Sequence, residues 1–121
     1  MPTTCSKALR TLACTAALLS SPAWAQFSGH DLQRCMRDPA LRDLCMMYVG
    51  GVADGLGMGF HTTQALNPSA TYAPFCAPAS ITRQQIYDLA RQHITRPQAA
   101  LQLPAALLIS EALATAYPCP Q

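Results

Sequence analysis

The cysteines of this chain limit its possible folds more than any other residues do. Lys7 and Arg10 precede a short apolar run, TLACTAALLSSP, and Ala23-Trp24-Ala25 follows, an arrangement typical of a cleavable signal peptide at residues 1–25. Cleavage after Ala25 removes two of the six cysteines. Those that remain are Cys35, Cys45, Cys76 and Cys119. An even number of cysteines in a small exported chain predicts two disulfides, with three possible pairings.

The mature chain, residues 26–121, is short and electrically balanced. Its six arginines are offset by five aspartates and one glutamate, and the formal charge of +2 comes from Lys7 and Arg10 in the leader. With no basic cluster, nucleic acid is not an expected partner. One domain of this size holds a modest core that disulfides can reinforce. The leader and the disulfides together indicate the bacterial periplasm, with no membrane contact in the mature form.

Apolar residues recur at helical intervals in four segments, and no segment reads as a strand. Ser28 with Asp31, and Thr82 with Gln85, have the spacing of N-terminal capping pairs. The expected helices cover 28–37, then 39 to a region near Phe60 where the helix frays or breaks, then 82–96. A last segment begins near 97 or restarts at 104 and ends near 117. Residues 61–80, rich in Pro, Ser, Thr and Ala, predict a long loop tethered at a cysteine. The predicted fold is a small all-α, disulfide-stapled bundle of four to five helices.

A glycine-rich run, LCMMYVGGVADGLGMGFH at 44–61, is the most unusual part of the second helix. It lacks the lysine of a phosphate-binding loop and the G-x-G-x-x-G spacing of a dinucleotide site. Asp54 and the short length argue against a membrane span. Gly51, Gly55 and Gly59 share one helical face, where missing side chains predict close packing within the bundle or across a dimer. We expect Asp54 to bond to a neighbouring segment, with partner recognition as the alternative.

Candidates for chemistry are few. Three histidines, His30, His61 and His93, are scattered, and no serine has the context of a nucleophile, so we expect no enzymatic activity and no cofactor. His93 lies on the apolar side of its helix and reads as a core residue. A soft copper(I) site is a lesser alternative, because methionine on an apolar helix is more often a core residue than a metal ligand. Its ligands would be Met46, Met47, Met58 and His61.

Five segments, taken in order, resemble the Rap/Tai family of small immunity proteins associated with bacterial type VI secretion. They are FSGHDLQRC at 27–35, CMMYVGGVADG at 45–55, FCAP at 75–78, ITRQQIYDLARQHITRP at 81–97 and AYPCP at 116–120. The matching positions are Phe27, Gly29, Leu32, Cys35, Cys45, Tyr48, Gly51, Asp54, Gly55, Phe75, Cys76, Pro78, Thr82, Gln85, Pro97, Pro118 and Cys119. Tyr117 stands where phenylalanine is usual.

The resemblance implies an exported helical protein that binds a peptidoglycan amidase delivered by neighbouring cells and occludes its active site, often as a dimer. The matching residues look structural, so we place the partner contacts in the intervening loop, at Asn67, Thr71 and Tyr72. A fold of this family does not guarantee its function. The alternative is a periplasmic chaperone or structural helical protein without a dedicated toxin partner, whose charge rises as its histidines protonate.

The preferred disulfide pairing joins Cys35 to Cys45 and Cys76 to Cys119. The first would clamp the hairpin between the first two helices. The second would anchor the long loop to the C-terminal end of the chain.

Overall fold

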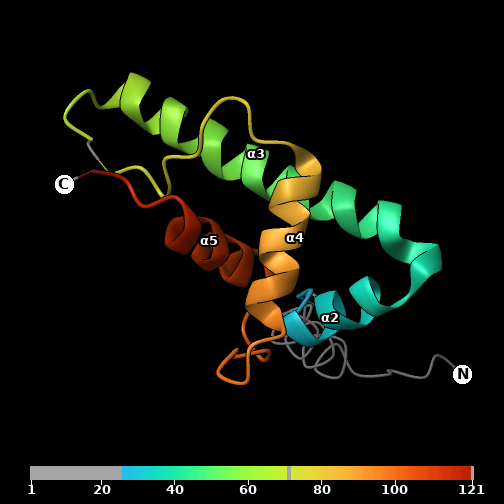
Figure 1. The fold of residues 1–121 in the computed structure, drawn as a ribbon. Coiled ribbons are helices and arrows are strands. Elements are labelled where there is room, and N and C mark those ends of the chain that lie inside the picture. The colour runs from blue at the N-terminus through green and yellow to red at the C-terminus, as the bar shows by residue number, and fades with distance from the viewer. Residues whose placement is uncertain (1–25, 71, 121) are drawn as a thin grey trace, which may run out of the picture.

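The computed structural model describes residues 26–70 and 72–120, which form four α-helices and one short 3-10 helix (Figure 1). The elements are α2 (Gly29–Arg37), η1 (Pro39–Leu41), α3 (Arg42–Leu66), α4 (Arg83–Ile94) and α5 (Ala105–Ala116). Within these two ranges the structure contains no strand, and β pairing is limited to an isolated bridge between Ser28 and Pro104. The predicted all-α fold is confirmed. The predicted signal peptide, residues 1–25, lies outside the described residues.

The long helix α3 is the central element of the bundle, and α2, α4 and α5 all contact it on one side (Figure 1). Apolar residues at helical intervals on α4 and α5 supply most of the buried core, whereas Ala116, at the end of α5, is exposed. The last helix restarts after Pro104, one of the two starts that the sequence allowed. The core consists of Leu32, Cys45, Val49, Ala53, Ile86, Tyr87, Ala90, Ile94, Ala105, Leu108, Ile109, Ala112 and Leu113.

Both predicted capping boxes are confirmed. At the start of α2, the Ser28 hydroxyl accepts a hydrogen bond from the Asp31 amide at 3.3 Å, and the Asp31 carboxylate accepts one from the Ser28 amide at 3.0 Å. Thr82 and Gln85 exchange the equivalent bonds at the start of α4. These contacts satisfy amide groups that a helix N-terminus leaves without intrahelical partners.

The capping box makes the stability of α2 sensitive to acid. Hydrogen bonds from the hydroxyl and then the amide of Ser28 hold the pKa of Asp31 below its ordinary value of 3.8. Ionised Asp31 therefore stabilises the fold above that value, and this contribution is lost as the pH falls through the lower folded pKa. We expect the urea midpoint of the wild type to drop more steeply than that of Asp31→Asn below about pH 4. Parallel slopes for the two proteins would contradict this role.

Gly29 lies where the N-terminal segment meets the turn before α5. The Gly29 amide donates to the Leu103 carbonyl at 2.9 Å, and the His30 amide donates to the Leu101 carbonyl at 3.0 Å. A Cβ at residue 29 would come within 2.8 Å of the Leu101 oxygen and would also clash with the side chain of Leu108. This glycine is therefore required for the close approach of two segments distant in sequence.

The predicted break near Phe60 is wrong, because α3 continues to Leu66 and the following loop begins at Asn67. Glycine lowers helix stability by about 1 kcal/mol relative to alanine without blocking helical geometry. No described glycine has a positive φ. The Asn67 amide closes the last turn by donating to the Thr63 carbonyl at 2.8 Å.

The expectation that the glycine face packs within the bundle is also wrong. A Cβ built on Gly51, Gly55 or Gly59 would meet no other atom within 4 Å. Gly50, one position earlier, instead faces the aliphatic part of the Arg83 side chain, which a Cβ added at Gly50 would contact at 3.5 Å. The buried face of α3 is the one that carries Cys45 and Val49, so the evenly spaced glycines lie on the outward face.

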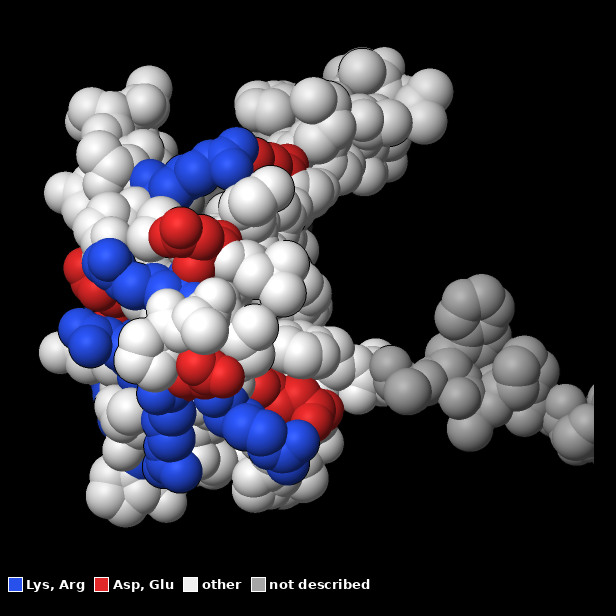
Figure 2. Space-filling view, turned by 90° about the vertical axis from the view of Figure 1, so that its right-hand side faces the viewer, with Lys and Arg blue, Asp and Glu red and all other residues white. Residues whose placement is uncertain are grey.

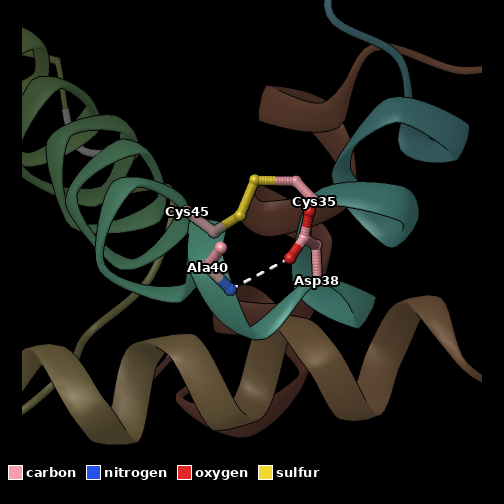
Figure 3. Close-up of a disulfide and its surroundings, with 4 residues drawn as sticks. All are labelled: Cys35, Asp38, Ala40 and Cys45. Atoms are coloured by element: carbon pink, nitrogen blue, oxygen red, sulfur yellow. Dashed lines mark hydrogen bonds between the residues drawn. A yellow bond between two sulfur atoms is a disulfide. The ribbon is translucent and has the colours of Figure 1, made fainter.

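Two disulfides hold the ends of the bundle. The structure joins Cys35 to Cys45, with 6.1 Å between their Cα atoms, and Cys76 to Cys119, with 4.9 Å. This is the pairing preferred from the sequence. Figure 3 shows the first bridge spanning the turn between α2 and α3, where the Asp38 carboxylate accepts a hydrogen bond from the Ala40 amide at 2.9 Å.

Candidate functional site

A groove of about 530 Å³ lies between the second half of α3 and the loop that follows it. One wall comes from α3 and the other from the loop. The lining residues are Gly55, Leu56, Gly59, Phe60 and Thr63 on α3, with Ala70, Tyr72 and Pro74 on the loop. Gly55 and Gly59 contribute no side chains, which leaves the floor of the groove open. Its lining is largely apolar and carries no ionisable group except the tyrosine.

The loop over this groove is held at both ends. At its start the Asn67 side chain accepts a hydrogen bond from the Ser69 amide at 3.2 Å, and the Ala70 amide donates to the Asn67 carbonyl. At its end Cys76 forms the disulfide to Cys119, and its amide donates to the Tyr117 carbonyl at 2.8 Å. A loop fixed in this way can present side chains to a partner with little loss of conformational entropy.

The three residues predicted to contact a partner have different placements. The Tyr72 side chain is 84% exposed and lines the groove. Asn67 is exposed on the same loop, but its amide oxygen is engaged in the local turn. Thr71 lies outside the described residues. The structure therefore brings Asn67 and Tyr72 onto one loop, and only Tyr72 of these two reaches the groove.

Asp54 lies opposite the first residue of α4. Its carboxylate is 3.6 Å from the guanidinium of Arg83, and both side chains are mostly exposed. The expected contact with a neighbouring segment is therefore present as a surface ion pair. Exposed pairs of this kind contribute at most about 1 kcal/mol, so the pair adds little to the stability of the fold.

Charged side chains of both signs alternate over the face seen in Figure 2. Neighbouring residues pair on the helices, with Arg34 near Asp31 at 3.7 Å and Arg91 near Asp88 at 3.5 Å. A shallow surface pocket of about 700 Å³ beside α4 includes Asp88, Arg91 and Tyr117. The mixture of signs produces no extended field of one charge on this face.

The histidines form no catalytic arrangement in the part of the chain that the structure describes. His93, expected to be a core residue, is only partly buried at the edge of the core, and its Nε2 lies 3.4 Å from the Glu111 carboxylate. His30 and His61 are exposed on other helices. Neither has a nucleophile beside it among the contacts of the described residues.

The copper alternative fails on geometry. Met46 and Met47 lie eleven or more positions before Met58 and His61 on the same straight run of helix. At 1.5 Å per residue the two pairs are about 16 Å apart, too far to share one ion. Within residues 26–70 and 72–120, no cluster of three His, Cys, Asp or Glu side chains has the arrangement of a metal site.

Sequence reasoning missed the exposure of several large apolar residues on α3. Leu44, Met47 and Met58 are 62%, 64% and 67% exposed. The sequence did contain a signal for this exposure. The second helix is long and has apolar residues on every side, so its apolar surface is larger than three neighbouring helices can cover.

None of the helices in the described ranges has the length and apolar character that crossing a membrane requires. No curated protein and no solved structure matches the chain. A family model described as Rap1a immunity proteins matches residues 28–119, a span that includes all four helices and both disulfides. The chain therefore belongs to the Rap1a immunity protein family.

Proposed function

We propose that this protein is exported to the periplasm by cleavage after residue 25 and there inhibits a peptidoglycan amidase delivered by type VI secretion. The observation that carries the proposal is the match of the Rap1a immunity family over residues 28–119. Two disulfides in a small domain suit an oxidising compartment, which supports export. Inhibition by occlusion requires only a surface that covers the active site of the amidase.

The loop that begins at Asn67 is the proposed contact with the amidase. Both its ends are tethered, and Tyr72 offers a large amphipathic side chain that is 84% exposed. Tyrosine is enriched among the residues that dominate binding energy at protein interfaces. We further propose that the protein acts as a homodimer.

The proposal is tested by coexpression in cells. An amidase encoded beside this gene, directed to the periplasm, should lyse cells that lack this protein and leave cells that express the full chain viable. A chain without residues 2–25 should not protect, because it stays in the cytoplasm. Lysis despite expression of the full chain would refute the immunity function. Protection by the leaderless chain would refute periplasmic action.

Truncation of Tyr72 tests the contact surface. We expect Tyr72→Ala to raise the dissociation constant for the amidase at least about tenfold, since buried aromatic anchors often carry about 2 kcal/mol or more. Leu107→Ala is the matched control, because Leu107 is an exposed apolar residue on α5. Isothermal titration calorimetry on both variants provides the comparison. Equal affinities for the two would place the contact elsewhere.

A further inference from the structure

The two disulfides differ in how deeply the folded chain buries them. Cys45 is 0% exposed and belongs to the hydrophobic core, and Cys35 is partly buried against that core. Cys76, by contrast, is exposed, and Cys119 is partly exposed. A disulfide is opened by direct attack of a thiolate on one of its sulfur atoms. Access therefore decides which bridge can react while the protein stays folded.

We propose that the Cys76–Cys119 bridge is a site of thiol–disulfide exchange in the folded protein. A dithiol opens this bridge and the disulfide form of such a dithiol closes it, while the Cys35–Cys45 bridge stays closed until the bundle unfolds. The exchange itself is independent of amidase binding. Its effect on the contact loop rests on the proposed function.

The hydrophobic core does not depend on the bridge at Cys76. Among residues 26–70 and 72–120, no buried apolar side chain lies between Ala53 and Ile86 or after Leu113. The core residues of α3 are confined to positions 45–53. The segments that the bridge joins reach the core only through partly buried side chains, such as Phe75. Opening the bridge therefore leaves the contacts among α2, α3, α4 and α5 in place.

The backbone keeps the two cysteines close even without the bridge. The Cys76 amide donates a hydrogen bond to the Tyr117 carbonyl at 2.8 Å, two residues before Cys119. Pro118 and Pro120 flank Cys119 and restrict its backbone on both sides. With 4.9 Å between the Cα atoms of the pair, this arrangement shortens the search that reclosure requires.

The exchange step at this bridge uses only solvent-accessible groups. A thiolate of the dithiol attacks the Cys76 Sγ, forms a disulfide with it, and releases the Cys119 sulfur as a thiolate that takes a proton from water. The second thiol of the dithiol loses its proton and attacks the mixed disulfide, which releases Cys76. Two electrons pass from the dithiol, which becomes a disulfide, to the bridge, which becomes two thiols.

The same step at the first bridge meets a barrier in the folded state. Attack on the Cys35 sulfur would have to expel the Cys45 thiolate into the apolar core, where an unpaired charge is strongly disfavoured. Attack on the Cys45 sulfur would require a thiolate to enter that core. The segments 72–80 and 115–120, by comparison, contain no acidic side chain that would repel the negative thiolate.

Opening the bridge frees one end of the contact loop. The loop begins at Asn67, carries the exposed Tyr72 and ends at Cys76. A loop that is held at one end alone loses more conformational entropy when it binds a partner. Affinity for the amidase therefore depends on the redox state of this bridge.

Selective reduction tests the proposal on the oxidised wild-type chain, residues 26–121. The protein is treated with dithiothreitol, samples are alkylated at intervals, and mass spectrometry of the peptides reports each cysteine. We expect alkylation of Cys76 and Cys119 at least about tenfold faster than that of Cys35 and Cys45, with the helical circular dichroism signal retained. In concentrated urea, where neither bridge is buried, the two rates should converge. Equal rates in the native protein, or loss of the helical signal in step with Cys76 reduction, would overturn the inference.

Reclosure and amidase binding complete the test. Oxidised glutathione added to the selectively reduced, unalkylated protein should restore the Cys76–Cys119 pair without denaturant, and failure to do so would also overturn the exchange site. The selectively alkylated protein should bind the amidase at least about tenfold more weakly than the oxidised protein in calorimetry. Equal binding by the two forms would overturn the effect on the loop. Lack of binding by the oxidised protein would refute the proposed function instead, and the reduction rates, measured without amidase, decide the exchange site in either case.

Discussion

Replacing Cys76 and Cys119 together by alanine is expected to lower the free energy of unfolding by about 4 kcal/mol. The bridge joins residues separated by 43 positions, and a longer closed loop restricts the unfolded chain more. It also fixes the loop between α3 and α4 to the C-terminal segment, where few other contacts hold it. Urea unfolding of the oxidised wild type and the double variant, followed by circular dichroism, measures the difference.

The other disulfide provides the control. Cys35 and Cys45 are separated by 10 positions, so the Cys35→Ala, Cys45→Ala protein should lose about 3 kcal/mol by the same chain-entropy estimate, plus a cost for the buried sulfur of Cys45. Only the loss of the long-range bridge should also weaken amidase binding, since it anchors the proposed contact loop. If the two double variants bind the amidase equally well, the loop is not the contact surface.

Gly29→Ala is expected to destabilise the protein by about 1–3 kcal/mol, the usual cost of overpacking. A Cβ at this position would lie 2.8 Å from the Leu101 oxygen and 2.9 Å from the Leu101 Cα. Relief of this clash requires the turn before α5 to move, which lengthens the hydrogen bonds from residues 29 and 30 to that turn. Thermal and urea unfolding monitored by circular dichroism provide the measurement.

Gly57→Ala is the matched control for Gly29→Ala. It lies inside α3 with open space around it, so a methyl group should raise the free energy of unfolding by roughly 0.5–1 kcal/mol through helix propensity alone. Opposite signs for the two substitutions would show that the contacts of Gly29, and not glycine itself, set the requirement. A stabilising Gly29→Ala would contradict the described packing.

Local rules were enough to predict α2, α4 and α5. Ser28 with Asp31 and Thr82 with Gln85 mark helix starts through contacts only three residues apart, which a sequence displays directly. The apolar spacing of α5 likewise identifies its buried face, because the three covering helices leave only one side of it open to water. The positions of the four cysteines and the family resemblance made the all-α, two-disulfide fold predictable.

The length and orientation of α3 were not predictable in the same way. Glycine spacing shows that three residues share a face, but it does not show whether that face points to the core or to solvent. Its direction is set by tertiary contacts, such as Arg83 lying over Gly50 and pairing with Asp54. The same limit applies to the proposed contact loop. The sequence places Asn67 and Tyr72 on one loop, but it does not show that Tyr72 lines the groove and Asn67 does not.

The most direct test of the proposed amidase inhibition uses residues 26–121 in the oxidised form to titrate any purified peptidoglycan amidase whose gene adjoins this one. The enzyme would be assayed on isolated peptidoglycan, and complex formation would be followed in the same samples by gel filtration. We predict that hydrolysis falls in proportion to added protein and approaches zero at one protomer per amidase. Undiminished hydrolysis in the presence of excess protein, with no complex formed, would contradict the account.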